Sequence, residues 1–237
     1  MIYTVGFYGA GDIGADGNSW FRQFWDRVGV SHRYVQNDGR SALHDFLAAI
    51  DKNGDMIIDA DDIVGLTVKV CGYSWGGISA IGFTQALSNA PTTIVVGGSP
   101  QNPIQYRLNV IIPIHVLLTV DPVPILNPPG TVFSNVVSFF NYYQQRGGYS
   151  DFRLVSNPAT GKIIGNFLSK LLKGTDIYSQ AGNTTQTRVD LGGFGTRLGI
   201  PFNIYNPPDS AEYSLAGTET NHDGMPWLVA DAAASIF

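Results

Sequence analysis

The sequence predicts an α/β protein with a mostly parallel central sheet and helices on both of its faces. The first observation is an alternation of short apolar runs with segments of helical spacing: strand-like 2–7, helix-like 19–28, strand-like 32–35, helix-like 41–50 and strand-like 66–71. Strands joined through helices pair in parallel, and the helices then cover both sheet faces. The second observation is the size and composition of the chain, which has 237 residues, 44% of them hydrophobic. We therefore expect residues 1–237 to form one domain with a large core.

The first predicted strand, Ile2–Phe7, runs into a glycine-rich turn, Gly6–Asp12. Turns of this composition allow backbone N–H groups to face a ligand. The spacing Gly9-x-Gly11-x-x-Gly14 also matches a G-x-G-x-x-G phosphate loop, although the helix that this motif requires does not begin directly after it. The turn therefore has three interpretations: a loop that faces a reacting group, a phosphate loop or an ordinary turn.

The composition excludes several classes of partner. The net charge is −5 and the sequence has no cluster of Lys and Arg, so we expect no binding to nucleic acid. No apolar run is long enough to span a bilayer and the first residues carry no charged leader, so we expect no transmembrane segment. The single cysteine, Cys71, excludes an intramolecular disulfide and is expected to be a small apolar side chain of a buried strand. These features leave the cellular compartment open.

A twelve-residue acidic segment, 51–62, precedes the strand at 66–71. Oxygen-bearing side chains stand at positions 1, 3, 5, 9 and 12 and an apolar residue at position 8, which is the pattern of an EF-hand calcium loop. The pattern departs from the motif at Met56, where a glycine is usual, and at Asp62, where a glutamate is usual. The alternative is therefore a solvated acidic loop that caps a helix. The expected ligands of one structural Ca²⁺ are Asp51, Asn53, Asp55, Ile57, Asp59 and Asp62.

The stretch from Leu66 to Leu87 contains the motif of a candidate catalytic serine. The run LTVKVC is short and rich in β-branched residues, which indicates a buried strand, and residues 78–87 have helical spacing. Between them, Gly72-Tyr73-Ser74-Trp75-Gly76 fits G-x-S-x-G, in which serine occupies a sharp strand-to-helix turn. Side chains at positions 72 and 76 would crowd this turn, whose central residue usually takes a strained positive φ. The competing interpretation is a small-residue turn whose serine only caps the helix.

These residues resemble the α/β-hydrolase superfamily, and GYSWGG is similar to the nucleophile elbow of its lipases and esterases. The resemblance is strongest over Cys71–Ile81 and implies the α/β-hydrolase fold for the chain. It also implies an oxyanion hole, in which one N–H comes from the residue after the nucleophile and another from a loop after an early strand. Here those residues are Trp75 and one of Tyr8, Gly9 and Ala10. No cofactor is expected for catalysis.

Two aspartates compete for the role of the catalytic acid. Thr92–Val96 and Val110–Val120 are both strand-like, and Asp121-Pro122 follows the second, at the sheet edge where doubly wound proteins place their sites. The Asp121-Pro122-Val123 step also resembles the Asp-Pro step of some lipases, although an aspartate before proline can simply open a turn. Asp190 is nearer in sequence to the C-terminal histidine, as the acid is in many hydrolases.

His222 is the predicted base. Of the four histidines, His32 and His115 fall in strand-like runs and His44 in a helix-like run, whereas His222 precedes the apolar segment 228–237 on a predicted loop. This placement resembles the hydrolase pattern and keeps the order Ser, Asp, His.

The segment 127–217 is rich in Pro, Gly, Asn and Thr. We expect it to form a lid or specificity region, with a strand over 136–143 and a short helix over 163–172.

The sequence thus predicts a serine hydrolase of carboxylic esters that uses Ser74, His222 and Asp121 through an acyl-enzyme intermediate. Small-molecule or lipid esters are the expected substrates, and thioesters or amides would use the same groups. The alternative from another class is a catalytically inactive α/β-hydrolase scaffold that acts as a calcium-dependent binding module.

Overall fold

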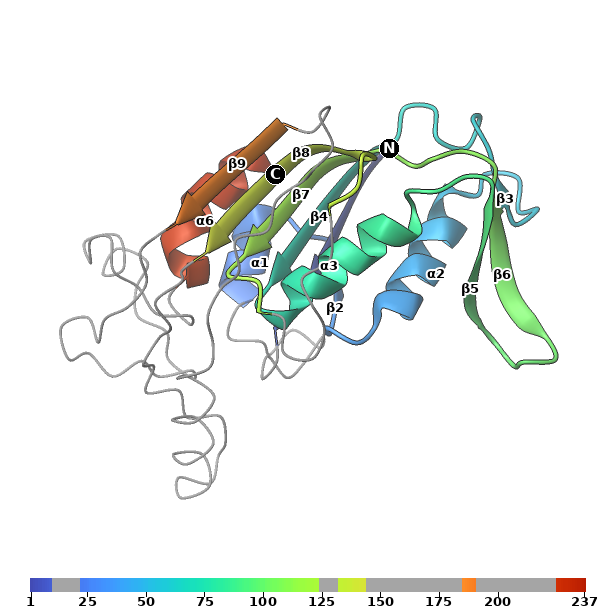
Figure 1. Cartoon of the computed structure of the whole chain (residues 1–237), viewed down its shortest axis with the longest axis horizontal. Coiled ribbons are helices and arrows are strands. Elements are labelled where there is room, and N and C mark those ends of the chain that lie inside the picture. Colours follow the sequence, from blue (N-terminus) through green and yellow to red (C-terminus); the bar gives the residue numbers. More distant parts are fainter. Residues whose placement is uncertain (10–21, 124–131, 144–184, 191–224) are drawn as a thin grey trace, which may run out of the picture.

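Six parallel strands form the central sheet of the protein (Figure 1). The computed structural model of the chain describes residues 1–9, 22–123, 132–143, 185–190 and 225–237. Within them the sheet order is β2–β1–β4–β7–β8–β9, and each pair of neighbours is parallel. The strands are β1 (Ile2–Phe7), β2 (His32–Tyr34), β4 (Thr67–Tyr73), β7 (Ile114–Val120), β8 (Val136–Tyr143) and β9 (Thr185–Asp190). The predicted α/β class is confirmed, and β1 and β8 have the predicted bounds.

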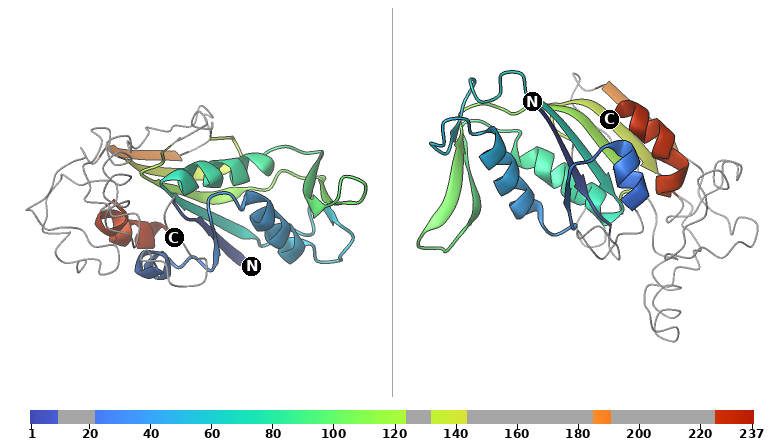
Figure 2. Two further views of the ribbon diagram at one scale, coloured as in Figure 1. Left: turned by 90° about the horizontal axis from the view of Figure 1, so that it is seen from below. Right: turned by 180° about the vertical axis from the view of Figure 1, so that it is seen from behind.

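Helices lie on both faces of this sheet (Figure 2). On one face, α2 (Gly39–Ile50) and α3 (Trp75–Ala86) bury their apolar side chains in a core shared with β1, β4 and β7. On the other, α1 (Arg22–Val28) and α6 (Met225–Ile236) pack together over a second core. The sheet is therefore sandwiched between two hydrophobic layers, as the alternation of elements predicts.

The strand before the serine is buried on both of its faces. Val68 and Val70 belong to the core beneath α2 and α3, whereas Cys71 and Tyr73 belong to the core beneath α1 and α6. A central parallel strand must be apolar on both sides, which explains the nearly continuous apolar run. Burial raises the pKa of the Cys71 thiol, so this residue stays protonated and fills space, as its sequence context predicts.

A second, three-stranded sheet has the order β3–β6–β5. The hairpin of β5 (Thr92–Gly98) and β6 (Pro103–Leu108) is antiparallel, and β3 (Ile57–Ile58) pairs in parallel with β6. The strand predicted over Thr92–Val96 therefore exists but lies outside the central sheet, beside α2 (Figure 1). The strand predicted over Val110–Val120 begins only at Ile114, because Pro113 has no N–H to donate to a neighbouring strand.

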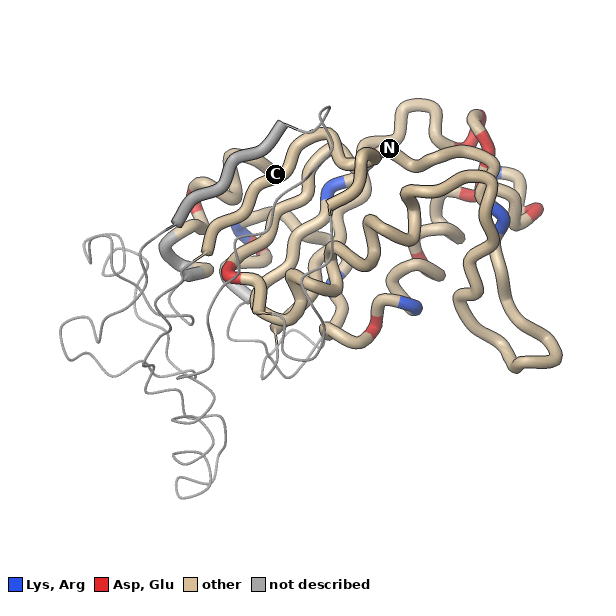
Figure 3. Tube along the Cα trace, viewed as in Figure 1, with Lys and Arg blue, Asp and Glu red and all other residues tan. Residues whose placement is uncertain are grey.

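Among the described residues, charged residues are sparse along the central sheet and gather around the acidic segment 51–62 (Figure 3). Only 14% of the residues are Asp, Glu, Lys or Arg. In the part of the chain that the structure describes, no helix has both the length and the apolarity needed to cross a bilayer.

The direction in which the chain adds strands to the sheet reverses between β1 and β4. From β1 the chain continues outward to β2, and from β4 it continues to β7, β8 and β9 on the other side. Open α/β sheets bind their ligands at such a switch point, beyond the carboxyl ends of the strands. The residues that follow β1 and β4 are Tyr8, Gly9 and Ser74, which places the predicted elbow at this point.

Candidate active site

Ser74 occupies a sharp turn between β4 and α3. Its φ is 56° and its ψ is −129°, so the backbone takes the positive φ that G-x-S-x-G predicts and that residues other than glycine rarely adopt. Such a conformation costs on the order of 1–3 kcal/mol and persists only where the surrounding structure enforces it. Although Ser74 is the N-cap residue of α3, its side chain makes no capping hydrogen bond, which argues against capping as its role.

The neighbours of β4 hold this turn from both sides. On the side of β1, a side chain at Gly76 would collide with the backbone carbonyl oxygen of Phe7, so only glycine allows α3 to begin there. On the side of β7, the N–H of Ser74 donates to the carbonyl oxygen of Val120 at 2.9 Å. The carbonyl oxygen of Ser74 in turn accepts the N–H of Val123 at 3.1 Å. Backbone packing and hydrogen bonds together fix the serine.

The residues after β1 pass directly beside the serine. A Cβ on Gly9 would stand 2.8 Å from the Cβ of Ser74, so the backbone of Gly9 lies against the serine side chain. The N–H of Tyr8 donates to the carbonyl oxygen of Tyr34 at 2.9 Å. The N–H of Tyr8 is therefore engaged by β2. Gly9 is left as the described loop residue for the oxyanion role, while Ala10 lies outside the described residues.

Trp75 begins α3. The first N–H groups of a helix have no acceptor within the helix, and they lie at the positive end of its dipole. The N–H of Trp75 is one of these first N–H groups, and Trp75 follows Ser74 directly in the chain.

Asp121 is the neighbour of Ser74 across the sheet. Tyr73, the last residue of β4, pairs with Val120, the last residue of β7. The next residues, Ser74 and Asp121, therefore share one row at the carboxyl edge. Because paired strands lie about 4.8 Å apart, the two backbones are close at this point.

The backbone of Asp121 is as constrained as that of the serine. Its φ is 45°, its side chain is fully buried, and its N–H donates to the carbonyl oxygen of Tyr142 at 2.6 Å. The following Pro122 packs on the elbow helix, since a Cβ on Gly77 would lie 2.8 Å from the Cβ of Pro122. The aspartate of an ordinary Asp-Pro turn would be exposed to solvent, whereas Asp121 is buried beside the elbow. The burial therefore argues against a simple turn.

Asp190, the competing acid, ends β9 in the same row. Asp190 pairs with Tyr143 of β8. Tyr143 follows Tyr142, the partner of Val120, just as Asp121 follows Val120. Three strand spacings separate its backbone from that of Ser74, about 14 Å, against one spacing for Asp121. Both predicted aspartates reach the carboxyl edge, and Asp121 is the nearer.

Three of the four histidines lie away from Ser74. The Nδ1 atom of His115 accepts the N–H of Val68, which is six residues before Ser74 on β4 and hence about 20 Å away. His32 stacks on Tyr3, near the start of β1, with ring centroids 4.1 Å apart. His44 is a partly exposed residue of α2, in contact with its neighbour Asp45. The remaining histidine, His222, lies outside the described residues, three residues before α6 begins.

Hydrogen bonds from its own side chains hold the acidic segment 51–62. Asp51 accepts two backbone N–H groups of the segment, at 2.9 and 3.0 Å. Asp62, which is buried, accepts the N–H of Lys52 at 3.0 Å and that of Asp59 at 2.9 Å. Asp62 therefore ties the beginning of the segment to its end.

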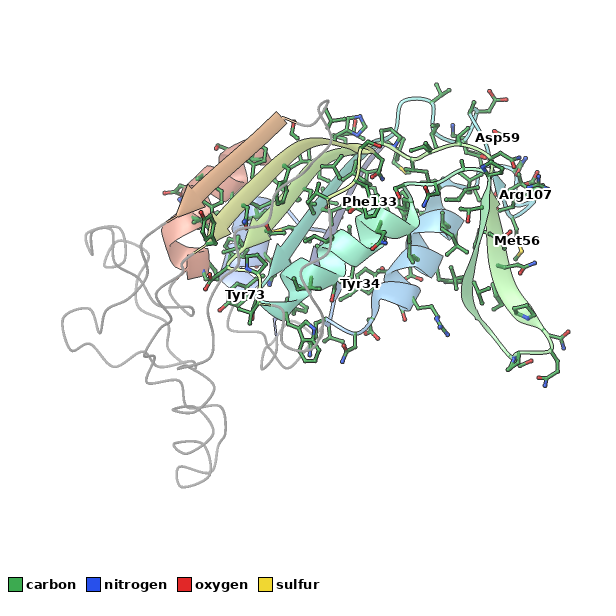
Figure 4. All side chains as sticks on the ribbon, viewed as in Figure 1. Tyr34, Met56, Asp59, Tyr73, Arg107 and Phe133 are labelled. Atoms are coloured by element: carbon green, nitrogen blue, oxygen red, sulfur yellow. The ribbon has the colours of Figure 1, made fainter. Side chains whose placement is uncertain are left out.

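The backbone of this segment turns sharply at the position where an EF-hand loop has its glycine. Met56, at the position of the motif glycine, has a φ of 62°. Met56, Asp59 and Arg107 lie along the junction of β3 with β6 (Figure 4). The acidic side chains do not converge, however: within the described residues, which include all of 51–62, no three His, Cys, Asp or Glu side chains are close enough to hold a metal ion. The segment therefore has a positive φ at the motif's glycine position, and its acidic side chains are not gathered around one point.

Several predicted features lie outside the described residues. They include Gly11 and Gly14 of the phosphate-loop interpretation, the helix over 163–172 and most of the region 127–217. The described parts of that region contain β8 and β9, so the central sheet extends into it.

The comparisons with known proteins find only low similarity. No family model matches the chain, and no curated protein matches it. A solved structure described as "a putative hydrolase of the alpha/beta superfamily", from Xanthomonas campestris pv. campestris, is 13% identical over 80% of this chain and 87% of that chain, with a TM-score of 0.32. A cutinase-like protein from Cryptococcus sp. is 11% identical over 100% of this chain and 92% of that chain, with a TM-score of 0.32. At these TM-scores the case for a function must come from the site itself.

The elbow yields a prediction with a matched control in the same helix. Gly76→Ala is expected to lower the free energy of unfolding by about 1–3 kcal/mol or more, because the new methyl group meets backbone that cannot move aside. Gly82, also in α3, has no described atom within 4 Å of a built Cβ. Gly82→Ala should therefore be neutral or stabilise by up to about 1 kcal/mol. Urea unfolding measures both, and equal stability of the two variants would contradict this account of the turn.

Proposed function

We propose that the protein is a serine hydrolase that cleaves carboxylic esters through an acyl-enzyme intermediate. The proposal rests mainly on the arrangement at the carboxyl edge of the sheet, where Ser74 has a positive φ, Gly9 lies against its side chain and Asp121 follows the neighbouring strand. Ser74 and Asp121 are both buried. Electrostatic interactions are stronger in such a site than in water, which favours charge-separating chemistry there.

In the proposed reaction His222 takes the proton of the Ser74 hydroxyl as its oxygen attacks the ester carbonyl carbon. A serine hydroxyl is a poor nucleophile at neutral pH, so this proton transfer is what makes attack feasible. The tetrahedral intermediate collapses when His222 gives the proton to the leaving alkoxide, which departs as an alcohol. Water then attacks the acyl-enzyme with His222 again as the base, which releases the carboxylic acid and restores the serine.

The charge that develops in these steps needs two stabilising elements. The carboxylate of Asp121 would accept a hydrogen bond from the far nitrogen of the His222 ring, which fixes the tautomer and stabilises the imidazolium. The N–H groups of Trp75 and Gly9 would donate to the oxyanion. Each donor of this kind is typically worth about 3 kcal/mol of the activation barrier.

Esters of small molecules or lipids are the substrate class that we propose. Thioesters and amides could react through the same groups, and the choice among them depends on side chains around the site. Nucleic acid is not proposed as a partner, because the chain has a net charge of −5.

A fluorophosphonate probe, which phosphonylates activated serines, tests the proposal. The wild type should take one label at Ser74, detected by intact mass and peptide mapping, and Ser74→Ala should take none. Ser88→Ala is the control, because Ser88 is also buried and follows the same helix, with its hydroxyl donating to the carbonyl oxygen of Gln85 at 2.7 Å. That variant should label at the wild-type rate. No label on the folded wild type would favour the inactive binding module instead.

As a second proposal, the segment 51–62 binds one structural Ca²⁺. Support comes from the spacing of its oxygen ligands and from the positive φ of Met56, which gives this non-glycine residue the turn that the motif requires. Binding would require the carboxylates to turn from backbone N–H groups toward a common point, because they do not converge in this structure.

Calorimetry and thermal unfolding test the calcium proposal. Titration with Ca²⁺ should release or absorb heat, and the melting temperature should rise with Ca²⁺ relative to a chelator, corresponding to about 2.7 kcal/mol at a hundred times the dissociation constant. Asp55→Ala, at an exposed ligand position, should abolish both effects. Identical melting curves of the wild type with calcium and with chelator, together with no heat, would show that side-chain hydrogen bonds alone hold the segment.

A further inference from the structure

Lys69 is the only Asp, Glu, Lys or Arg residue in the four inner strands of the central sheet, β1, β4, β7 and β8. Its side chain is half-buried. Because side chains alternate along a strand, it faces the same layer as Cys71 and Tyr73, beneath α1 and α6. Inner strands of a parallel sheet are normally apolar on both faces, so an ammonium group here requires specific partners.

The partner of Lys69 is the residue that follows α6. The ammonium group donates to the main-chain oxygen of Phe237 and lies 5.8 Å from the centroid of the Phe237 ring. The N–H of Phe237 donates to the carbonyl oxygen of Ala233 at 3.0 Å, so Phe237 continues the last turn of the helix. A cation is stabilised at this end of a helix, where the dipole is negative, and over the face of an aromatic ring. Lys69 therefore fastens the end of α6 to a central strand.

The lengths of α6 and β4 connect this contact to the candidate active site. Figures 1 and 2 show α6 running behind the sheet against the direction of the strands. From Phe237 back to Met225 the helix spans about 18 Å, and β4 spans about 17 Å from Lys69 to Ser74. With the end of α6 held at Lys69, its first residue is therefore level with Ser74.

The axial position of α6 limits where the proposed base can act. His222 is joined to Met225 by three residue steps, at most about 11 Å of chain. A shift of the helix by one turn, about 5 Å, would use half of that span. Among the described side chains of α6, those in the core are small, namely Val229, Ala230 and Ala233. Small side chains interlock only shallowly with a facing layer, so an anchor at the helix end is needed to limit such a shift.

We propose that Lys69 is a positioning residue that sets the axial position of α6, and thereby the level at which the chain brings His222 to Ser74. Lys69 lies about 17 Å from Ser74 along β4, so it does not touch the reacting atoms and acts through the helix. Misplacing a catalytic group by about 1 Å can lower a rate about 100-fold. The inference rests on the proposed hydrolase and adds to it the residue that holds the helix of the base.

The first test measures kcat and KM for a p-nitrophenyl ester in variants whose folding is checked by circular dichroism. Lys69→Met keeps the apolar stem and should lower kcat about 10-fold or more at an unchanged KM, as expected when only the base is misplaced. Lys69→Arg keeps a cation that can donate and stack on the ring, so it should restore most of kcat. Arg27→Met is the control, because Arg27 contacts Asp231 of α6 at the exposed surface. It should keep the wild-type kcat.

The second test is a double-mutant cycle on urea unfolding, which needs no activity. Lys69→Met and Phe237→Ala should be non-additive, because each removes the contact between the cation and the ring. Phe237→Ala should also lower kcat, so the kinetic test does not depend on one variant.

An unchanged kcat in folded Lys69→Met, an equal loss in Arg27→Met, or additive losses of stability in the cycle would overturn the inference. A wild type that hydrolyses no ester and takes no fluorophosphonate label would instead overturn the proposed hydrolase. The cycle would still decide whether Lys69 anchors Phe237, so the two failures are distinguishable.

Discussion

The approach of α3 to the end of β1 is the contact on which the rest of the site depends. At Gly76 the helix lies so close to the carbonyl group of Phe7 that no side chain fits. Helix and strand can meet this closely only if the chain reverses sharply after β4, and the reversal places Ser74 at a positive φ. The same closeness sets the backbone of Gly9 against the serine. One steric constraint thus positions the nucleophile and the loop beside it.

The parallel register extends this constraint across the sheet. Ser74, Asp121, Tyr143 and Asp190 follow or end successive strands in one row, so groups far apart in sequence meet at a single edge. The apolar strands on both sides of this row supply the rigidity, because their side chains are locked between two helical layers. Thr119 and Asn141 are buried polar side chains within this packing, and the hydroxyl of Thr119 donates to Oδ1 of Asn141.

Local patterns in the sequence predicted the features that local physics determines. The bounds of β1 and the positive φ at Ser74 follow from β-branched runs and from glycine spacing. Pairing partners are not local, which is why the sequence did not reveal that β5 lies outside the central sheet or that the N–H of Tyr8 is paired with Tyr34. β9 was missed because its sequence, TQTRVD, has a single strongly apolar residue, which is enough for a strand at the edge of a sheet.

The central claim is that a histidine and an aspartate distant in sequence converge on Ser74, and kcat/KM for a p-nitrophenyl ester tests it most directly. We predict that His222→Ala and Asp121→Asn each lower kcat/KM by about 10⁴-fold, while Asp190→Asn stays close to the wild type. A His222→Ala variant that hydrolyses the ester at the wild-type rate, or an Asp190→Asn variant that alone loses activity, would contradict the account.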